Sequence, residues 1–335
     1  MRRTLAVVLV LTAFTLSSSC KGRKAAVEAA YTSWDATMEK ATTDTEKLAA
    51  TKAFLGRFPD TEHTEDVAST LAYLLGDALG KPAEADAFLI DLAEKVKDPD
   101  RKLAVVGVRL GVLGKLKDGA RLRQAVAEFT KGRELKFGDR STVADAAIEC
   151  GEWALALDTA EAALPFATPE VVKADNPNRK LSEQRVADTA RRRKVGMLGT
   201  KGWALANLGR LDEAVVVLRE AHAADFRGYM GNTESSAGSY LGRALAMAGK
   251  KDEAADVLTV AALYGDDKAA METLKGHLAA ASESDGGFDA YLTATRLRLA
   301  RTVDDFTLPD YAGKPQTFSK LRNSEVTLLS FWFPT

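Results

Sequence analysis

Two stretches of the chain carry the same pattern of glycine, alanine and leucine, and this internal repeat constrains the fold more than any other feature. The first copy reads Leu198-x3-Gly202-x2-Leu205-x3-Gly209-x2-Asp212-Glu213-Ala214-x3-Leu218-x2-Ala221. The second reads Gly238-x3-Gly242-x2-Leu245-x3-Gly249-x2-Asp252-Glu253-Ala254-x3-Leu258-x2-Ala261, so every marked position recurs at one constant offset, the one that separates Gly202 from Gly242. Repetition at a fixed period of this size predicts one supersecondary unit stacked on its copy.

The spacing within each copy predicts a helix, a turn and a second helix. Gly202 and Gly242 lie inside the first helix, where the missing side chain lets the partner helix approach closely. Gly209 and Gly249 are expected to end that helix, because the residue after a helix often takes the left-handed conformation that glycine adopts freely.

The second helix of each copy has signals of its own. Asp212 and its counterpart Asp252 place negative charge in the first turn, which the helix dipole favours. Ala214 and Ala254 are expected to face the partner helix. Leu218 and Leu258 are expected to fill the groove between the two helices.

These residues resemble the tetratricopeptide repeat (TPR). The glycine and alanine signature positions match, whereas leucine stands where that family often has tyrosine. The offset exceeds the usual period of about 34 residues, so residues 225–233 are expected to form extra linker. The resemblance implies a curved array of helical hairpins that binds a peptide or partner protein on its concave face. A generic α-solenoid or an irregular bundle is the alternative, especially before residue 140.

Weaker copies and breaks complete the helical part. One weaker copy reads Ala144-x2-Ala147-x3-Gly151-x4-Ala156-x6-Ala163, and another reads Gly80-x4-Ala85-x3-Leu89. Three prolines over 165–180 exclude a continuous helix there and predict a connecting loop, either solvated or covering the concave face. A break over 282–287 precedes the last expected helix, 288–300.

The start of the chain has the order of an export signal. Arg2 and Arg3 precede an apolar run over 5–16, and small residues then lead to Cys20. The run is too short to cross a hydrocarbon layer of about 30 Å as a helix. The cysteine after small residues resembles the lipobox of bacterial lipoproteins, although Ser17 stands where leucine is usual. The resemblance implies lipidation of Cys20 and membrane attachment in the cell envelope, as an outer-membrane lipoprotein facing the periplasm. An ordinary signal peptide cut near Cys20 is the alternative.

The net charge and the positions of the cysteine and histidine residues argue against nucleic-acid binding, catalysis and metal binding. The formal net charge is −1, so nothing favours binding to nucleic acid, and the basic run over 191–194 is interpreted as a solvated helix face. Cys150 is interpreted as a buried small side chain. His63, His222 and His277 are far apart and show no metal-ligand spacing. The sequence therefore predicts no catalytic, cofactor or metal site within these residues.

Residues 301–335 carry a second resemblance. Asp305-Phe306-Thr-Leu-Pro-Asp310 and Gly313-Lys314-Pro315 predict two short β elements around a turn, and residues 326–332 read as an apolar strand. With Phe318-Ser-Lys-Leu321 they resemble the start of the redoxin branch of the thioredoxin superfamily. That branch includes TlpA-like thiol–disulfide oxidoreductases and AhpC/TSA peroxiredoxins.

In the TlpA-like group a Cys-x-x-Cys sequence follows that strand at a helix N-terminus, which lowers the pKa of the attacking thiol. Aligned on Phe331-Trp332, the first cysteine is expected about one position beyond Thr335, so the chain is expected to be the N-terminal portion of a longer protein. In the peroxiredoxin alternative, Phe333-Pro334 precedes a Thr-x-x-Cys loop. No catalytic residue of either family is present, so this chain alone is expected to be inactive in thiol exchange.

The sequence thus predicts a mainly α fold: a TPR-like helical hairpin array (α-solenoid), followed by an incomplete α/β thioredoxin-like segment. The expected organisation is a signal peptide over 1–19, a weakly TPR-like helical region over 20–135, TPR-like repeats over 136–300 and the start of a redoxin domain over 301–335. The implied function is an exported thiol–disulfide oxidoreductase whose repeats bind a partner. A non-catalytic TPR scaffold lipoprotein and a peroxiredoxin-type peroxidase are the alternatives.

Overall fold

The structure is a computed structural model of the chain, and it describes residues 20–227, 233–265, 267–278, 287–299, 305–310 and 312–321. The predicted signal segment over 1–19 and the predicted strand over 326–332 lie outside the described residues. Among the residues that are described, no helix is long and apolar enough to span a membrane.

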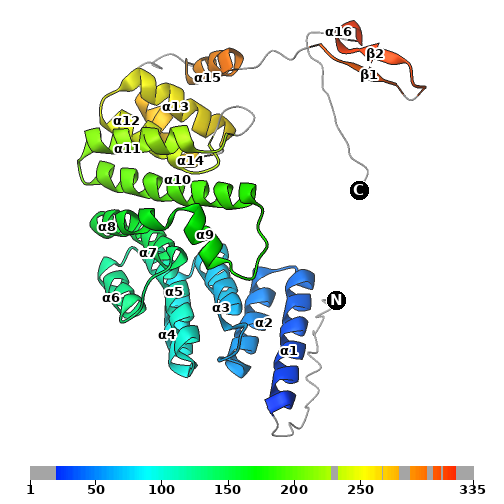
Figure 1. The fold of residues 1–335 in the computed structure, drawn as a ribbon, viewed down its shortest axis with the longest axis vertical. Coiled ribbons are helices and arrows are strands. Elements are labelled where there is room, and N and C mark those ends of the chain that lie inside the picture. Colours follow the sequence, from blue (N-terminus) through cyan, green and yellow to red (C-terminus); the bar gives the residue numbers. More distant parts are fainter. Residues whose placement is uncertain are drawn as a thin grey trace, which may run out of the picture. The chain divides into compact units, whose positions relative to one another are not determined.

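The chain divides into two compact units, Met1–His277 and Leu278–Thr335. The domain boundaries expected from the sequence stay predictions. The first unit is built from helices (Figure 1), beginning with α1 (Cys20–Lys40), α2 (Asp44–Arg57), α3 (Thr64–Tyr73), α4 (Pro82–Lys95), α5 (Pro99–Leu116), α6 (Gly119–Thr130) and α7 (Phe137–Cys150). It continues with α8 (Trp153–Ala163), α9 (Pro169–Asp175), α10 (Glu183–Asn207), α11 (Leu211–Ala224), α12 (Ala237–Met247), α13 (Lys251–Tyr264) and α14 (Lys268–Leu278). A π-helical turn, Leu74–Ala78, follows α3, and a 3₁₀ turn, Leu164–Phe166, follows α8.

Successive helices pack as hairpins, and each hairpin packs on the next. Helix α7 pairs with α8, α10 with α11, and α12 with α13. The first helices also contact one another, α7 with α10 and α10 with α12, while α11 contacts α12 (Figure 1). The prediction of a mainly α chain is confirmed, and this stacking is compatible with the predicted helical array.

The two glycine-containing copies pack as their spacing predicts. A Cβ atom on Gly202 would lie 2.4 Å from Leu218 Cγ, and one on Gly242 would lie 2.7 Å from Leu258 Cγ. Both leucine side chains are fully buried. Hydrogen is therefore the only side chain that fits at either glycine without movement of its partner.

The turn between the two helices is also repeated. Gly209 and Gly249 have φ angles of +80° and +73°. The backbone amide after each glycine donates to a carbonyl of the preceding helix, Arg210 to Leu205 (3.0 Å) and Lys250 to Leu245 (2.9 Å). These bonds satisfy carbonyls that the helix end leaves open, so both glycines turn the chain where the first helix ends.

The α7–α8 hairpin is a third copy with a different packing pair. Gly151 ends α7 at φ +82°. Counted from this glycine, Ala144 and Ala160 occupy the places that Gly202 and Leu218 hold in the next hairpin, and both alanines are fully buried. In this hairpin two alanines occupy the contact positions, whereas the other two hairpins pair a glycine with a leucine.

The segment over 165–180 differs from the predicted loop, because it contains helix α9. The Thr168 hydroxyl accepts a bond from the Val171 amide, and Pro169 occupies the first turn, where a missing N–H is harmless. Val172 is fully buried with Val186 and Ala190 of α10. The prolines exclude a continuous helix, as predicted, but one of them starts a short packed helix.

The extra linker between α11 and α12 is confirmed, and one buried carboxylate organises it. Helix α11 ends at Ala224, and α12 begins at Ala237. Asp225, 3% exposed, accepts hydrogen bonds from the Phe226 amide (2.7 Å) and from the amide and hydroxyl of Ser235 (3.1 and 2.6 Å).

Helices α1–α5 share one core cluster, which is mostly aliphatic but contains a group of aromatic side chains on α1 and α2. The Tyr31 ring lies 5.3 Å from Trp34 and 6.1 Å from Phe54, measured between ring centroids. The Trp34 indole N–H donates to the Thr51 hydroxyl at 3.2 Å, so its polar atom is satisfied although the ring is buried.

The second unit contains α15 (Gly287–Leu299), β1 (Thr307–Pro309), β2 (Pro315–Thr317) and α16 (Phe318–Leu321). The strands pair antiparallel with Leu308 opposite Gln316, and Gly313 (φ +77°) lies in the turn. The two predicted β elements are therefore confirmed. The two-stranded sheet is the only one in the part of the chain that the structure describes, and a thioredoxin fold stays a proposal.

Candidate binding site

One position recurs on the first helix of successive hairpins, directly after the close-packed residue. Asp145 follows Ala144 on α7, Trp203 follows Gly202 on α10, and Arg243 follows Gly242 on α12. His277 of α14 follows Gly276, which lies one ordinary TPR period after Gly242 but has open space around it instead of a packed partner. We call Asp145, Trp203, Arg243 and His277 the ladder residues.

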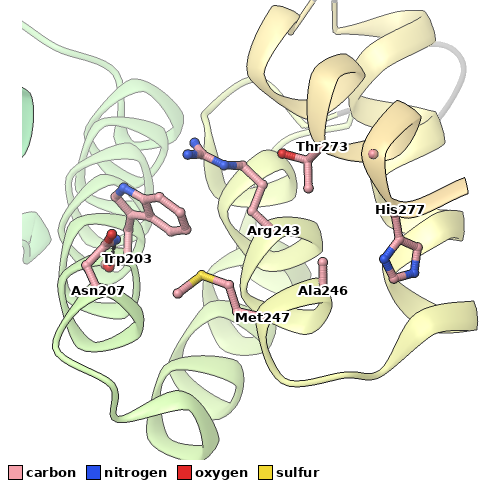
Figure 2. Close-up of a pocket in the computed structure, with 8 residues that line it drawn as sticks. Trp203, Asn207, Arg243, Ala246, Met247, Thr273 and His277 are labelled. Carbon is pink, nitrogen blue, oxygen red and sulfur yellow. Dashed lines mark hydrogen bonds between the residues drawn. The ribbon is translucent and has the colours of Figure 1, made fainter. Parts of the chain in front are cut away.

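Three of the ladder residues line one pocket (Figure 2). The pocket has a volume of about 530 Å³ and opens widely to solvent. Its other side chains are Asn207 of α10, Ala246 and Met247 of α12 and Thr273 of α14. Helices α10, α12 and α14 thus contribute to a single surface.

A rigid aromatic platform forms the centre of the pocket. The Trp203 ring, 6% exposed, stacks on Tyr240 with centroids 5.1 Å apart and planes 5° from parallel. The Arg243 guanidinium carbon lies 4.0 Å from the Trp203 ring centroid, which is cation–π geometry. These two contacts hold the indole in place before any ligand arrives.

Arg243 is an incompletely compensated cation. Burial lowers the pKa of its guanidinium, but an arginine stays charged in proteins. Within the described ranges, no carboxylate forms an ion pair with it, although Asp267 acts on it from a distance. A half-buried cation without a carboxylate partner favours an anion supplied by a ligand.

The polar groups around Arg243 offer mainly acceptors. The Asn207 amide N–H donates to the Trp203 carbonyl (2.8 Å), which leaves its oxygen to accept. The Thr273 hydroxyl donates to the Ala269 carbonyl (2.8 Å), and His277 Nε2 donates to the Lys251 carbonyl (3.0 Å). A ligand with both N–H donors and a negative charge complements this set.

Asp145 extends the surface toward α7 with the opposite charge. Its side chain is exposed at the surface. Desolvation by the surrounding protein nevertheless raises the pKa of its carboxyl, and a hydrogen bond from Ser141 partly offsets this shift. The pKa of Tyr240 is raised first by burial and further by Asp145. The ladder therefore presents an acid, an aromatic ring, a cation and an imidazole in chain order.

The sequence identified the frame of this site but not its functional surface. The predicted signature residues Gly202, Gly209, Gly242 and Gly249 pack helices together or turn the chain, and Ala214 and Ala254 are fully buried beside them. None of the six lines the pocket. The position after each repeat glycine was the available signal, but its residue type differs in every copy.

Other residues singled out from the sequence have structural roles. Cys20 is the first residue of α1, and its lipidation stays a prediction. Cys150 is partly buried beside the α5–α7 core, and burial raises the pKa of its thiol, which suits a packing role. Burial and the neighbouring Arg227 lower the pKa of His222.

The basic run over 191–194 is largely exposed on α10, as its interpretation as a solvated face predicts, and its side chains also contact neighbouring segments. Arg191 donates to the last carbonyls of α11, at Ala224 and Asp225. The other three pair with carboxylates of neighbouring segments: Arg192 with Glu234 (3.0 Å), Arg193 with Asp175 (2.8 Å) and Lys194 with Glu220 (2.9 Å). The run holds α10 to its neighbours.

Comparison with known proteins adds no relative. No protein-family model matches the chain, and no curated protein matches it significantly.

Proposed function

We propose that the helical array is a TPR-type binding module, and that its ladder face binds an extended acidic segment of a partner protein. The observation that carries this proposal is Arg243, a half-buried guanidinium on an aromatic platform without a carboxylate partner in the described residues. A carboxylate of the partner segment would complete its charge.

The form of the site favours a polypeptide over a small molecule. The pocket is open rather than enclosed, whereas small-molecule sites bury most of their ligand. The alternate helices α10, α12 and α14 contribute to it, so an extended chain crossing them contacts a new side chain at each of these helices. The partner's backbone N–H groups match the acceptor atoms of Asn207 and Thr273, and Met247, 48% exposed, offers an adaptable apolar contact.

We also propose that this module belongs to an exported thiol–disulfide oxidoreductase of the TlpA-like type, attached to the membrane at Cys20. Support comes from the order of the sequence resemblances and from the β1–β2 hairpin, whose Phe306 and Phe318 rings stack at 5.0 Å. The repeats would then select the partner whose thiols the redoxin domain acts on. A non-catalytic scaffold lipoprotein and a peroxidase are the competing versions.

Peptide binding tests the first proposal. Fluorescein-labelled peptides of equal length and matched apolar content, either Asp/Glu-rich or Lys/Arg-rich, are titrated with the full chain by fluorescence anisotropy. We expect the acidic peptides to bind preferentially and Arg243→Gln to weaken that binding about tenfold or more. Arg210→Gln is the control, because Arg210 is exposed in a turn and already paired with Glu213. Equal binding of both peptide classes, or no effect of Arg243→Gln, contradicts the proposal.

A thiol-exchange assay tests the second. The complete protein is expected to reduce or isomerise a disulfide substrate, and replacement of each cysteine after the redoxin strand is expected to abolish turnover. Residues 20–335 alone are expected to be inactive, because acylation of Cys20 leaves Cys150 without a second thiol in the fragment, and burial raises the pKa of Cys150. Turnover by that fragment, or activity that survives the replacements, would refute the assignment.

A further inference from the structure

A histidine and two glutamates from distant parts of the sequence meet at the edge of the α1–α3 region. Glu28 lies on α1, while Glu62 and His63 lie in the connection that leads into α3. Their ligand atoms all lie within 4.8 Å of one another. His63 Nε2 is 3.3 Å from Glu28 Oε1.

The imidazole is held in place by contacts that leave Nε2 facing the carboxylates. The His63 ring stacks on Tyr31 with centroids 3.7 Å apart and planes 8° from parallel. Tyr31 donates its hydroxyl to Asp66 at 2.9 Å. Glu28 and Tyr31 are three residues apart on α1, and His63 and Asp66 are three apart at the start of α3, so two matching helix faces clamp the ring.

We propose that Glu28, Glu62 and His63 form a binding site for a divalent transition-metal ion, with Zn²⁺ as the reference ion. Imidazole nitrogen and carboxylate oxygen are ligands that Zn²⁺ accepts, and three protein ligands leave a position for water. With neutral His63, the two carboxylates supply a charge that matches one divalent cation.

The geometry needs only a small adjustment. Zinc bonds to nitrogen and oxygen are about 2.0–2.2 Å long, so two ligand atoms of one ion are at most about 4.4 Å apart. The Glu28 and Glu62 side chains are 48% and 56% exposed, so their carboxylates can move toward the imidazole. Lys24, 3.9 Å from Glu62 and 71% exposed, is free to turn into solvent when the ion enters.

Such an ion would join α1 to the start of α3. Helix α1 otherwise meets the array through the aromatic contacts described above and through apolar side chains such as Val27 and Met38. A metal that binds only the folded protein stabilises it. Metal binding is therefore expected to raise the unfolding temperature as well as to give a direct binding signal.

Co²⁺ and Zn²⁺ titrations of the untagged full chain, after chelator treatment, test the proposal. We expect one equivalent of Co²⁺ to produce visible d–d absorption, which Zn²⁺ then displaces, and Zn²⁺ to raise the unfolding temperature. His63→Ala and Glu62→Gln are expected to weaken binding by more than tenfold. Tyr31→Leu removes no ligand and is expected to weaken it by roughly 10–100-fold, as loss of a supporting group does.

Glu65→Gln is the matched control for Glu62→Gln, since it removes one negative charge from the first turn of α3 without removing a ligand. Because Glu62 is exposed, its variant is expected to fold even where the His63 variant does not. Absence of Co²⁺ absorption in the parent chain overturns the proposal. So does binding that survives both His63→Ala and Glu62→Gln, or that falls equally in Glu65→Gln.

Discussion

In the α10–α13 hairpins the contact between paired helices is made by a glycine and a leucine, whereas α1, α2 and the start of α3 meet through a cluster of aromatic rings. The first arrangement recurs from one hairpin to the next with nearly the same geometry. The second involves Tyr31, Trp34, Phe54 and His63 in one arrangement that no other part of the first unit repeats among its described residues.

The difference shows that packing and binding can be carried out either by different residues or by the same residue. In the hairpins, Gly202 and Gly242 determine the contact, so the residues that follow them can build the pocket: Trp203 is its buried platform, and the half-buried Arg243 lies over that ring. In the α1–α3 region, His63 belongs to the packing itself, because its ring stacks on Tyr31. The hairpins can therefore provide a site for a partner protein, and the α1–α3 region can provide a site for an ion.

The largest effect is expected where one aromatic ring carries the contact. Trp34→Ala removes a buried indole and its hydrogen bond to Thr51, and we expect it to lower the free energy of unfolding by about 3–5 kcal/mol. Tyr73→Ala, at a side chain that is 59% exposed, is expected to change it by less than about 0.5 kcal/mol. Urea unfolding followed by circular dichroism measures both. A cost below about 1 kcal/mol for Trp34→Ala would mean that the aromatic core is not what holds this region.

A smaller effect is expected where a glycine carries the contact. Gly202→Ala places a Cβ against Leu218, and we expect a loss of about 1–3 kcal/mol despite the better helix propensity of alanine. Gly196→Ala on the same helix has open space around it and is expected to stabilise by up to about 1 kcal/mol. If both variants gained stability, close approach at Gly202 would be irrelevant.

The α7–α8 hairpin suggests a rescue. Leu218→Ala alone is expected to cost about 2–5 kcal/mol. Combined with Gly202→Ala it recreates the Ala144–Ala160 pair, so the double variant is expected to lose less than the sum of the two by about 0.5–3 kcal/mol. A double-mutant cycle in urea measures this coupling, and simple additivity would show that the two copies do not share one packing rule.

The smallest effect concerns pH and the linker between the copies. Burial and the Arg227 guanidinium, which donates to His222 Nε2 at 2.9 Å, lower the pKa of His222. The unfolded chain therefore binds a proton more readily below about pH 6.5, and this contribution to stability is lost as the pH falls through the lowered pKa. Between pH 7.5 and 5.0, His222→Gln is expected to lose less stability than the parent chain. If the stability of His222→Gln and of the parent chain depended on pH in the same way, groups other than His222 would cause the acid sensitivity.

The sequence predicted the repeated parts well because local spacing determines them. The turn glycines, the buried Leu218 and Leu258 and the β1–β2 hairpin all follow from short patterns. Helix α9 was missed because Pro169 was interpreted as a helix breaker rather than a helix start. The meeting of Glu28 with His63 depends on helices folding back over a long stretch of chain, and no spacing rule contains that information.

The ladder has a consequence for how such an array can change. Ala144, Gly202 and Gly242 keep the hairpins together, while Asp145, Trp203 and Arg243 directly beside them have nothing in common chemically. A substitution at one rung alters a single contact with the bound chain and leaves the neighbouring rungs intact. The array can therefore acquire a new binding preference one substitution at a time, and the protein stays folded at each step.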